Sequence, residues 1–473
     1  MFLARLLVLF SLVCISCAHS SFEQKQLKHA LDFATSNRLE LEILLQHYTY
    51  DSLKLEAAKF LIRNMPHCYS YQQGGEMDSV KRVRTYYSPF GQIDQTYARR
   101  WGHYTYRNLP KIYDAHIITA EYLIDNIDRA FDNWQKRPWN RSLSFEDFCE
   151  YLLPYRIGDE PLEEWRELYE KKYGYLLDSI YKGSDVVEAA NLVSRHLQEP
   201  VFIYCEDFEL PHIGPRYLFS HRYGSCVDAA DIVTYAFRAV GIPCMEDTDA
   251  RGGHVWNVVR DTTGRDVPIW YIASEAVRGS RDTGGYKRGK VYRPMYGFQE
   301  EKAAHLGDDW KSMPLLFYHP YMKDVSYAYY PDTLRILTGI PDDEVCYLAH
   351  FHEAHWWSCA CARSASGKME IPNLESELVY LPMKYTKGNY YPSGFPFWFA
   401  GGEINTFLPD WEKTVKVRLY RKYPVYGWLR SFMSHVVGGT FEGSMTKDFE
   451  DGKRLYEIAD TPVIARNRIF LNK

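Results

Sequence analysis

Apolar residues recur at spacings of three and four positions in the first part of the chain, a pattern that predicts helices. Two such sets lie at 41–45 and 57–62. Ser144 and Asp147 have the spacing of a capping box, so a further helix is expected to begin directly after Ser144. These signals predict a helical region over residues 22–195.

The pattern changes after about residue 325 to short aromatic and β-branched runs that are separated by Gly, Asn and Pro. The run VYLPMKY (379–385) and the run YYPSGFPFWF (390–399) are separated by a Lys-Gly-Asn turn. We therefore expect a β-rich region over residues 315–473.

A helix and a hairpin are predicted between these two regions. Residues 226–240 carry one apolar stripe and are followed by Gly241 at the C-cap position. Residues 255–259 and 267–271 read as two strands joined by a tight turn. The expected fold class is α+β, in which the helix packs on an antiparallel sheet within a central core over residues 196–300.

The first seventeen residues read as a signal peptide. Arg5 precedes an apolar run (6–16) that is too short to span a bilayer as a helix. The end of this run resembles the bacterial lipobox, in which Cys17 becomes lipid-modified and N-terminal. Cys14 stands where that pattern prefers an aliphatic residue, so cleavage without lipid stays the alternative. Either route predicts an exported protein, as an outer-membrane lipoprotein or in the periplasm.

Composition and charge argue against several classes of partner and cofactor. The length of 473 residues is enough for about three domains. The 56 Lys and Arg residues against 61 Asp and Glu residues give a net charge of −5, which argues against a nucleic-acid partner. The cysteines after residue 17 have irregular spacing, and most are expected to be buried small apolar residues. The glycine motifs of nucleotide sites are absent, and no cofactor is predicted.

Cys226 is the first candidate catalytic residue. Ser225 is a suitable N-cap for the predicted helix, and Asp228 completes a capping box. The thiol therefore lies at the first helical position, where unpaired amide groups and the helix dipole favour a thiolate. A cysteine in an amphipathic helix is more often a packing residue, so this position alone does not assign a nucleophile.

His254 is the second candidate catalytic residue. It stands at the start of the predicted hairpin, directly after Gly252 and Gly253, which leave room for its ring beside another element. A cysteine at a helix start followed by a histidine on a strand is the arrangement that a thiolate–imidazolium pair requires. The histidine would then act first as a base and later as an acid.

Residues 220–260 resemble the transglutaminase-like superfamily, a papain-related fold with a Cys-His-Asp triad. The resemblance rests on G-x-C ending at Cys226, a helix end R-A-x-G-I-P, and G-H-x-W-N around His254. It implies Cys226 as the nucleophile and His254 as the general base. It also implies an oxyanion hole made by the backbone amide of Cys226, helped by an upstream side chain such as Tyr223.

The third member of the triad departs from the pattern of that family. In relatives the orienting Asp ends the second strand, but pairing this hairpin places an uncharged residue of 271–273 opposite His254. Glu275 follows closely enough to reach His254 if the strand bulges, and it is the first choice. The alternatives are Asp247 or Asp249, just ahead of the histidine, or no acidic partner at all.

A closer resemblance covers most of the chain. Segments such as FEDFCEYLLPYRIGDEP (145–161) and YPSGFPF (391–397) resemble a family of secreted, uncharacterised transglutaminase-domain lipoproteins from Gram-negative gut bacteria. The resemblance implies an architecture and a catalytic centre rather than a reaction. Residues 436–460 resemble the opening of a discoidin-like, carbohydrate-binding β-sandwich, and residues 461–473 are too few to complete it.

Two further groups of polar residues have less specific patterns. Three histidines and two cysteines within 350–361 have side chains that suit zinc, but the same positions fit the faces of a β-hairpin, and no metal is predicted. Arg156 and Glu160 either line a cleft or form an ion pair.

Two functions are consistent with these features. The first is a cell-envelope cysteine hydrolase or transamidase that acts on a peptide, glycopeptide or peptidoglycan amide through a thioester. The second is a catalytically weak or inactive relative that binds glycan or protein through aromatic β surfaces, for which 39 Tyr, 24 Phe and 12 Trp supply the rings. Whether an acidic side chain orients His254 decides between the two functions. Membrane contact is expected only through the lipid anchor, and the sequence predicts no oligomeric state.

Overall fold

The computed structural model of the chain describes residues 22–86, 96, 100–101, 104–205, 208–251, 253–270, 275–281, 287–299, 313–337, 342, 344–352, 355–410, 412, 438–446 and 451–457. The expected signal peptide (1–17), with Cys17, lies outside the described residues. Among the helices that the structure describes, none is long and apolar enough to cross a membrane.

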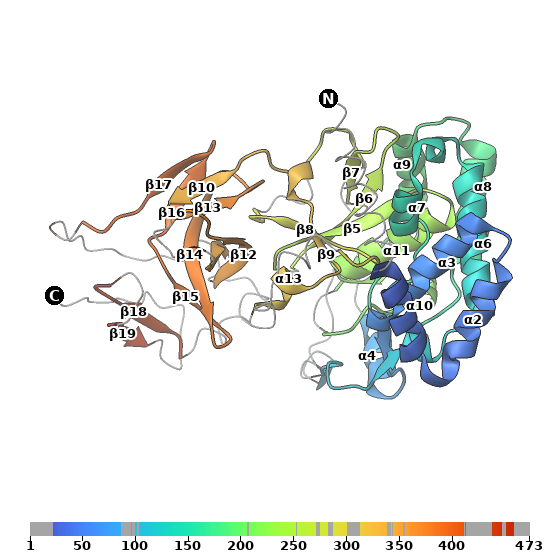
Figure 1. Cartoon of the computed structure of the whole chain (residues 1–473), viewed down its shortest axis with the longest axis horizontal. Coiled ribbons are helices and arrows are strands. Elements are labelled where there is room, and N and C mark those ends of the chain that lie inside the picture. Colours follow the sequence, from blue (N-terminus) through green and yellow to red (C-terminus); the bar gives the residue numbers. More distant parts are fainter. Residues whose placement is uncertain are drawn as a thin grey trace, which may run out of the picture. The chain divides into compact units, whose positions relative to one another are not determined.

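The described residues form two compact units (Figure 1). The first unit contains the described residues within 1–286, 291–307 and 318–329. The second unit contains the described residues within 287–290, 308–317 and 330–473. The segments on either side of residue 195, which the sequence divides into a helical region and a core, lie in the same unit. Helices and largely antiparallel sheets together place the chain in the α+β class, as expected.

The N-terminal part of the first unit is helical, as the spacing of its apolar residues predicts. Residues 22–33 are helical, and the helices that follow are α2 (Arg38–His47), α3 (Ser52–Asn64), α4 (Glu76–Arg84), α6 (Ala120–Lys136), α7 (Phe145–Tyr151), α8 (Arg166–Tyr175) and α9 (Val186–Leu197). Short turns of other helix types and one strand pair connect them: η1 (Thr35–Asn37), η2 (Met65–His67), η3 (Asp114–His116), η4 (Pro138–Ser142), η5 (Leu176–Ile180), β1 (Tyr69–Tyr71) and β2 (Lys111–Tyr113). Leu41, Leu61 and Phe148 are fully buried in the core that α2, α3, α6 and α7 share. Ser144 accepts a hydrogen bond from the Asp147 amide at 3.0 Å, so the predicted start of α7 is confirmed.

A five-stranded antiparallel sheet forms another layer of the first unit. In spatial order its strands are β7 (Asp266–Ile269), β6 (Val255–Arg260), β5 (Cys244–Asp249), β8 (Val291–Pro294) and β9 (Met322–Asp324). β6 and β7 form the predicted hairpin, with Asn257 opposite Ile269 and Gly264 in the turn at φ +76°.

The helix α11 (Cys226–Ala239) packs on this sheet, and Figure 1 shows it between the strands and α8. It follows α10 (Pro215–Ser220) and a short parallel strand pair, β3 (Ile203–Tyr204) and β4 (Tyr223–Gly224). Ile232, Val233 and Ala236 are fully buried in the core that α11 shares with α8 and α9. The predicted start of this helix is confirmed, and its C-cap is Val240, one residue before the predicted Gly241, which follows at φ +81°.

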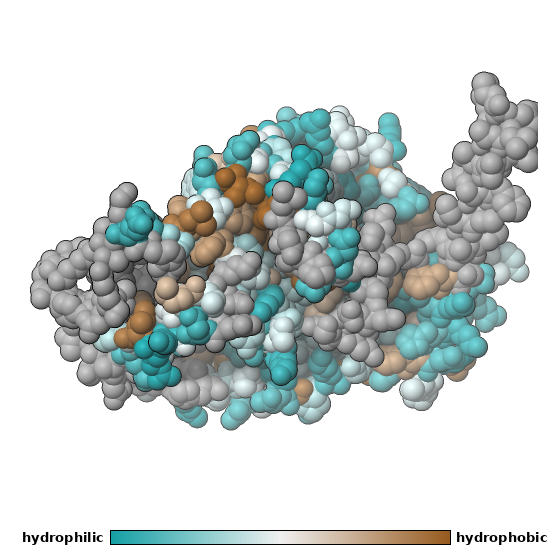
Figure 2. Space-filling view, turned by 60° about the vertical axis from the view of Figure 1, so that its left-hand side comes forward, coloured by the Kyte–Doolittle hydropathy of each residue, from teal (hydrophilic) through white to brown (hydrophobic). Residues whose placement is uncertain are grey.

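The second unit is rich in antiparallel strands. Its strands are β10 (Leu334–Leu337), β11 (Val345–His352), β12 (His355–Arg363), β13 (Lys368–Ile371), β14 (Leu378–Thr386), β15 (Asn389–Pro392), β16 (Phe397–Ala400), β17 (Glu403–Thr406), β18 (Thr440–Gly443) and β19 (Lys453–Glu457). Of the remaining elements, α13 (Leu315–Tyr318) begins in the second unit, and η7 (Ser326–Ala328) belongs to the first. The predicted turn between β14 and β15 is confirmed. Phe351, Phe407 and Leu408 are more than half exposed, and Figure 2 shows hydrophobic residues in separate groups on the face it presents.

Candidate functional site

Cys226 is the first residue of α11 and is 6% exposed. The Ser225 amide donates a hydrogen bond to Asp228 Oδ2 at 2.7 Å, and the Ser225 hydroxyl donates to the same oxygen at 3.2 Å. The contact of the Ser225 amide is one half of the predicted capping box, and the Asp228 amide makes the other half by donating to the Ser225 hydroxyl. The box fixes the first turn of the helix beside the thiol. The helical position of Cys226 is thus confirmed, and its role as a nucleophile stays a prediction.

His254 lies directly before β6 and is 5% exposed. Its ring meets the ring of Trp270 edge-on, with centroids 4.7 Å apart, and lies 5.5 Å from the centroid of Trp256. The helix α11 packs on β6 where Asn257 Nδ2 donates to the carbonyl of Ala230 at 3.0 Å. The structure therefore brings the helix that begins with Cys226 beside the strand that begins after His254.

Glu275 is paired with a residue other than His254. Its carboxylate accepts a hydrogen bond from Arg195 Nη1 at 2.6 Å, and both side chains are about half exposed. Among the described residues, no other side chain is bonded to this carboxylate, and residues 271–274 lie outside them. The geometry gives no support to Glu275 as the acid that orients His254.

The two alternative acids also have partners of their own. Asp247 is fully buried and pairs with Arg293 at 2.6 Å, while it accepts a second bond from the Tyr329 hydroxyl at 2.7 Å. Asp249 accepts bonds from the amide of Gly253 at 2.8 Å and from Arg251, and so closes the turn before His254. In the described part of the chain, neither carboxylate is hydrogen-bonded to the His254 ring.

Tyr223, the predicted helper of the oxyanion hole, lies on β4, three residues before Cys226. Its ring is partly buried against a small apolar cluster that includes Val80, Val83 and Phe208. Tyr223 is therefore close to the start of α11 in sequence, and its ring is held by packing against this cluster.

The other described cysteines have the burial expected of packing residues, apart from Cys361. None of the eight described cysteines forms a disulfide, and all but Cys361 are buried. Burial raises the pKa of Cys346 to about 11 and that of Cys244 to about 12, and it raises the pKa values of Cys68 and Cys149 further. These four thiols stay protonated at neutral pH.

A cavity of about 560 Å³ lies within the first unit at the start of α11. Ser225, Val227 and Asp228 line it, so the neighbours of Cys226 on both sides border this space. Arg84 reaches Asp228 from α4 at 2.9 Å, and both side chains are almost fully buried. This ion pair ties the first turn of α11 to the helical part of the unit.

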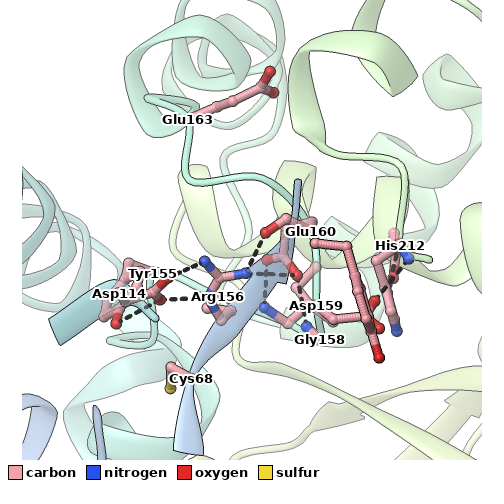
Figure 3. A network of polar contacts seen from close by, with 12 residues as sticks. Cys68, Asp114, Tyr155, Arg156, Gly158, Asp159, Glu160, Glu163 and His212 are labelled. Atoms are coloured by element: carbon pink, nitrogen blue, oxygen red, sulfur yellow. Dashed lines mark hydrogen bonds and ion pairs between the residues drawn. The ribbon is translucent and has the colours of Figure 1, made fainter. Parts of the chain in front are cut away.

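Arg156 is the centre of a buried polar network on one wall of the cavity (Figure 3). Its guanidinium donates to both carboxylate oxygens of Asp114 and to the carbonyl of Glu160. Burial opposes the charged form, but the carboxylates of Asp114 and Glu160 outweigh it and hold the pKa of Arg156 well above its ordinary value. The sequence allowed Arg156 and Glu160 either to line a cleft or to form an ion pair. Both interpretations apply, because Arg156 lines the cavity and lies 3.6 Å from the Glu160 carboxylate.

A second buried pair joins α11 to the loop before α10. His212 Nδ1 lies 2.9 Å from the nearer carboxylate oxygen of Asp231, which is fully buried, while His212 keeps 24% of its side chain exposed. Burial disfavours the charged imidazole, but Asp231 outweighs it, and the pKa of His212 is held well above its ordinary value. The ring packs against Gly158, where a Cβ would lie 2.3 Å from Nε2, so a larger residue would displace it. Figure 3 shows this ring beside Asp159.

The described residues contain no group of three or more His, Cys, Asp or Glu side chains that is arranged to hold a metal ion. β11 and β12 form an antiparallel hairpin instead, with His350 opposite Trp357 and Cys361 opposite Tyr347. The hairpin interpretation of residues 350–361 is therefore confirmed.

Sequence reasoning missed residues of the cavity wall, above all His212 and Glu246, and it missed Asp231, which pairs with His212. The contacts that place them join distant parts of the chain, such as Arg84 and Asp228, which are 144 positions apart. One signal was present, because Asp231 interrupts the apolar stripe of a helix and a buried carboxylate needs a partner.

Comparisons with protein-family models, with curated proteins and with solved structures found no match to the chain.

Proposed function

We propose that the chain is a cell-envelope cysteine hydrolase or transamidase of the transglutaminase-like type, with Cys226 as the nucleophile and His254 as the general base. One observation carries this proposal: Cys226 stands at the capped start of a buried helix that packs on the strand directly after His254. Ser225 and Val227, the neighbours of Cys226, line the cavity, whereas Cys226 and His254 are not among its described lining residues, so the cavity supports the proposal only as a space near the start of α11.

In the proposed reaction the Cys226 thiolate attacks the carbonyl carbon of a peptide, glycopeptide or peptidoglycan amide and forms a C–S bond. The backbone amide of Cys226 and the Tyr223 side chain would stabilise the oxyanion that develops. The C–N bond then breaks, His254 gives its proton to the departing amine, and a thioester is left. Water or a second amine attacks the thioester, passes a proton to His254 and frees the thiolate.

This function implies an architecture and a location. A papain-like transglutaminase core would lie within residues 196–300, between the helical region and the β-rich region that ends in an incomplete discoidin-like segment. The packing of α11 on an antiparallel sheet supports that core. A lipid on Cys17 would anchor the exported protein to a membrane, and the chemistry needs no cofactor.

A second function is favoured by the pairing of Glu275 with Arg195 rather than with His254. Neutralising a triad acid lowers the rate by about 10⁴-fold, so without Glu275 in that role the rate depends on which other group orients His254. The second function is therefore a weak or inactive relative that binds glycan or protein.

The rate of labelling by an iodoacetamide probe across pH separates the two functions. If the enzyme proposal is correct, Cys226 reacts faster than every other cysteine at neutral pH, and Cys226→Ala removes the fast reaction. His254→Asn should slow it by about tenfold or more, because the thiolate loses its base. Cys361→Ala, which removes the most exposed described cysteine, is the matched control and should leave the rate unchanged. Faster reaction at Cys361, or an unchanged rate in His254→Asn, would favour the binding protein.

A further inference from the structure

The His254 ring packs against two indole rings. The ring of Trp270 meets it edge-on with centroids 4.7 Å apart, and the ring of Trp256 lies 5.5 Å away at an interplanar angle of 32°. A hydrogen bond to one ring nitrogen fixes a single direction in the imidazole plane, whereas contacts with neighbouring rings fix the plane itself. The two indoles therefore restrict how far the His254 ring can turn.

The orientation of Trp256 is fixed by a hydrogen bond at the far end of its side chain. Trp256 is fully buried on β6, and its Nε1 donates to the Tyr329 hydroxyl at 2.9 Å. The Tyr329 ring also meets the indole edge-on, with centroids 5.9 Å apart. An indole N–H can only donate, and leaving it buried without an acceptor is costly. The Tyr329 hydroxyl therefore selects one orientation of the ring that His254 packs on.

The Tyr329 hydroxyl is itself oriented by Asp247. It donates to Oδ2 of this carboxyl group at 2.7 Å, and Asp247 lies opposite Trp256 in the pairing of β5 with β6. Burial and the nearby Asp247 hold the pKa of Tyr329 well above its ordinary value, so the hydroxyl keeps the proton that it donates. One hydroxyl thus accepts a bond from β6 and donates a bond to β5.

The backbone before Tyr329 is anchored to the same sheet. Tyr329 follows η7, in a segment that returns to the first unit after residues 308–317 of the second unit. The Val291 amide on β8 donates to the hydroxyl of fully buried Ser326 at 2.9 Å, and the Val325 amide donates to the Val291 carbonyl at 3.0 Å. These bonds hold the segment against the sheet and so place the Tyr329 side chain.

We propose that Tyr329 is a positioning residue for His254 and acts through the Trp256 indole that its hydroxyl holds. The inference rests on the proposed function, because it explains how the general base is held for its proton transfers. Its effect is a larger fraction of molecules in which the His254 ring has the reactive orientation. The residue that completes the histidine site therefore comes from outside the segment that carries Cys226 and His254.

Tyr329→Phe in the full chain removes only the hydroxyl and keeps the ring that packs on Trp256. The labelling rate of Cys226 by an iodoacetamide probe should fall by about threefold or more, because the His254 ring spends less time in its reactive orientation. The rise of this rate with pH should also move to higher pH, since a displaced imidazolium stabilises the thiolate less.

Tyr151→Phe is the matched control. Tyr151 is as buried as Tyr329, and its hydroxyl bonds to Asp266 and Arg293 in the same network of side chains. Arg293 also bonds to both oxygens of Asp247, and these bonds do not involve Tyr151. The labelling rate and its pH profile should therefore match those of the parent. An equal loss of rate in both variants would mean that the Tyr329 hydroxyl supports only the fold, and it would overturn the inference.

A double variant tests whether the hydroxyl acts through the indole. Trp256→Phe removes the N–H that Tyr329 accepts, so adding Tyr329→Phe to it should slow labelling no further. If the two losses multiply instead, Tyr329 does not act through Trp256 and the inference is wrong. If Tyr329→Phe alone does not fold, as shown by circular dichroism, an unchanged labelling profile in Trp256→Phe overturns the inference.

Nuclear magnetic resonance of the His254 ring separates this inference from the proposed function. The full chain carries Cys226→Ala and isotope-labelled histidine, and the His254 signal is the one that His254→Asn removes. Tyr329→Phe should shift this signal, because the ring moves relative to the indoles, and Tyr151→Phe should leave it in place. If the parent shows no fast labelling of Cys226, the proposed function fails and this signal alone decides. An unshifted signal in Tyr329→Phe, or an equal shift in Tyr151→Phe, overturns the inference.

Discussion

The Glu275 carboxylate and the Arg195 guanidinium form an ion pair at 2.6 Å in which both side chains are about half exposed. An exposed pair of this kind contributes about 0–1 kcal/mol, because water screens both charges. An acid that orients a catalytic histidine must instead bond to the ring nitrogen that faces away from the nucleophile. Reaching His254 would require Glu275 to give up its present partner.

Glu275→Gln is therefore expected to leave the labelling rate of Cys226 and its pH profile unchanged. The same substitution should change the free energy of unfolding by less than about 1 kcal/mol, since it removes one surface ion pair. Arg195→Gln breaks the pair from the other side and is the matched control. A lower rate in Glu275→Gln alone would restore Glu275 as the orienting acid.

The elements that carry the candidate residues were predictable because their signals are local. Ser225 and Asp228 stand three residues apart and mark the start of α11, and Gly241 marks its end. The β6–β7 hairpin follows from alternation around one glycine turn. The cavity was not predictable, since its walls come from contacts such as Arg84 with Asp228 that no spacing in the sequence reports.

The capping box of α11 provides a test at the scale of one element. Ser225→Ala removes the hydroxyl of the N-cap and should cost about 1 kcal/mol of unfolding free energy. Because the first turn also holds Cys226, the substitution should in addition slow the labelling of this thiol. Urea unfolding and the probe reaction measure the two effects separately.

Ser144→Ala is the matched control, because Ser144 caps α7 and is likewise followed three residues later by an aspartate. It should cost a similar free energy and leave labelling of Cys226 unchanged. Equal labelling in both variants and the parent would mean that the start of α11 does not activate the thiol.

The first unit is assembled from chain segments that the second unit interrupts. Residues within 318–329 return to it, where Met322–Asp324 adds the edge strand β9 and the Tyr329 hydroxyl bonds to buried Asp247. Tyr321, in the same returning segment, stacks on His67 with ring centroids 3.5 Å apart. Sequence patterns divide a chain at changes of composition, so they could not show that this distant segment completes the helical half of the molecule.

The His67 ring links that assembly to pH. Burial, with the nearby His319, lowers the pKa of His67 to about 3, below the ordinary value of about 6.5 that applies when the chain is unfolded. Between these values the unfolded chain binds a proton that the folded chain does not, so stability is complete above about pH 6.5 and is lost as pH falls. The loss from this one group should be about 2 kcal/mol at pH 5.

His67→Phe keeps a ring for Tyr321 to stack on and should remove this part of the pH dependence, as seen by urea unfolding of the full chain at pH 5 and pH 7.5. His221→Phe, which replaces an exposed ring stacked on Tyr217, is the matched control and should unfold with the pH dependence of the parent. If His67→Phe retains the full acid sensitivity of the parent, His67 is not the partly buried neutral group that joins the returning segment to the helices.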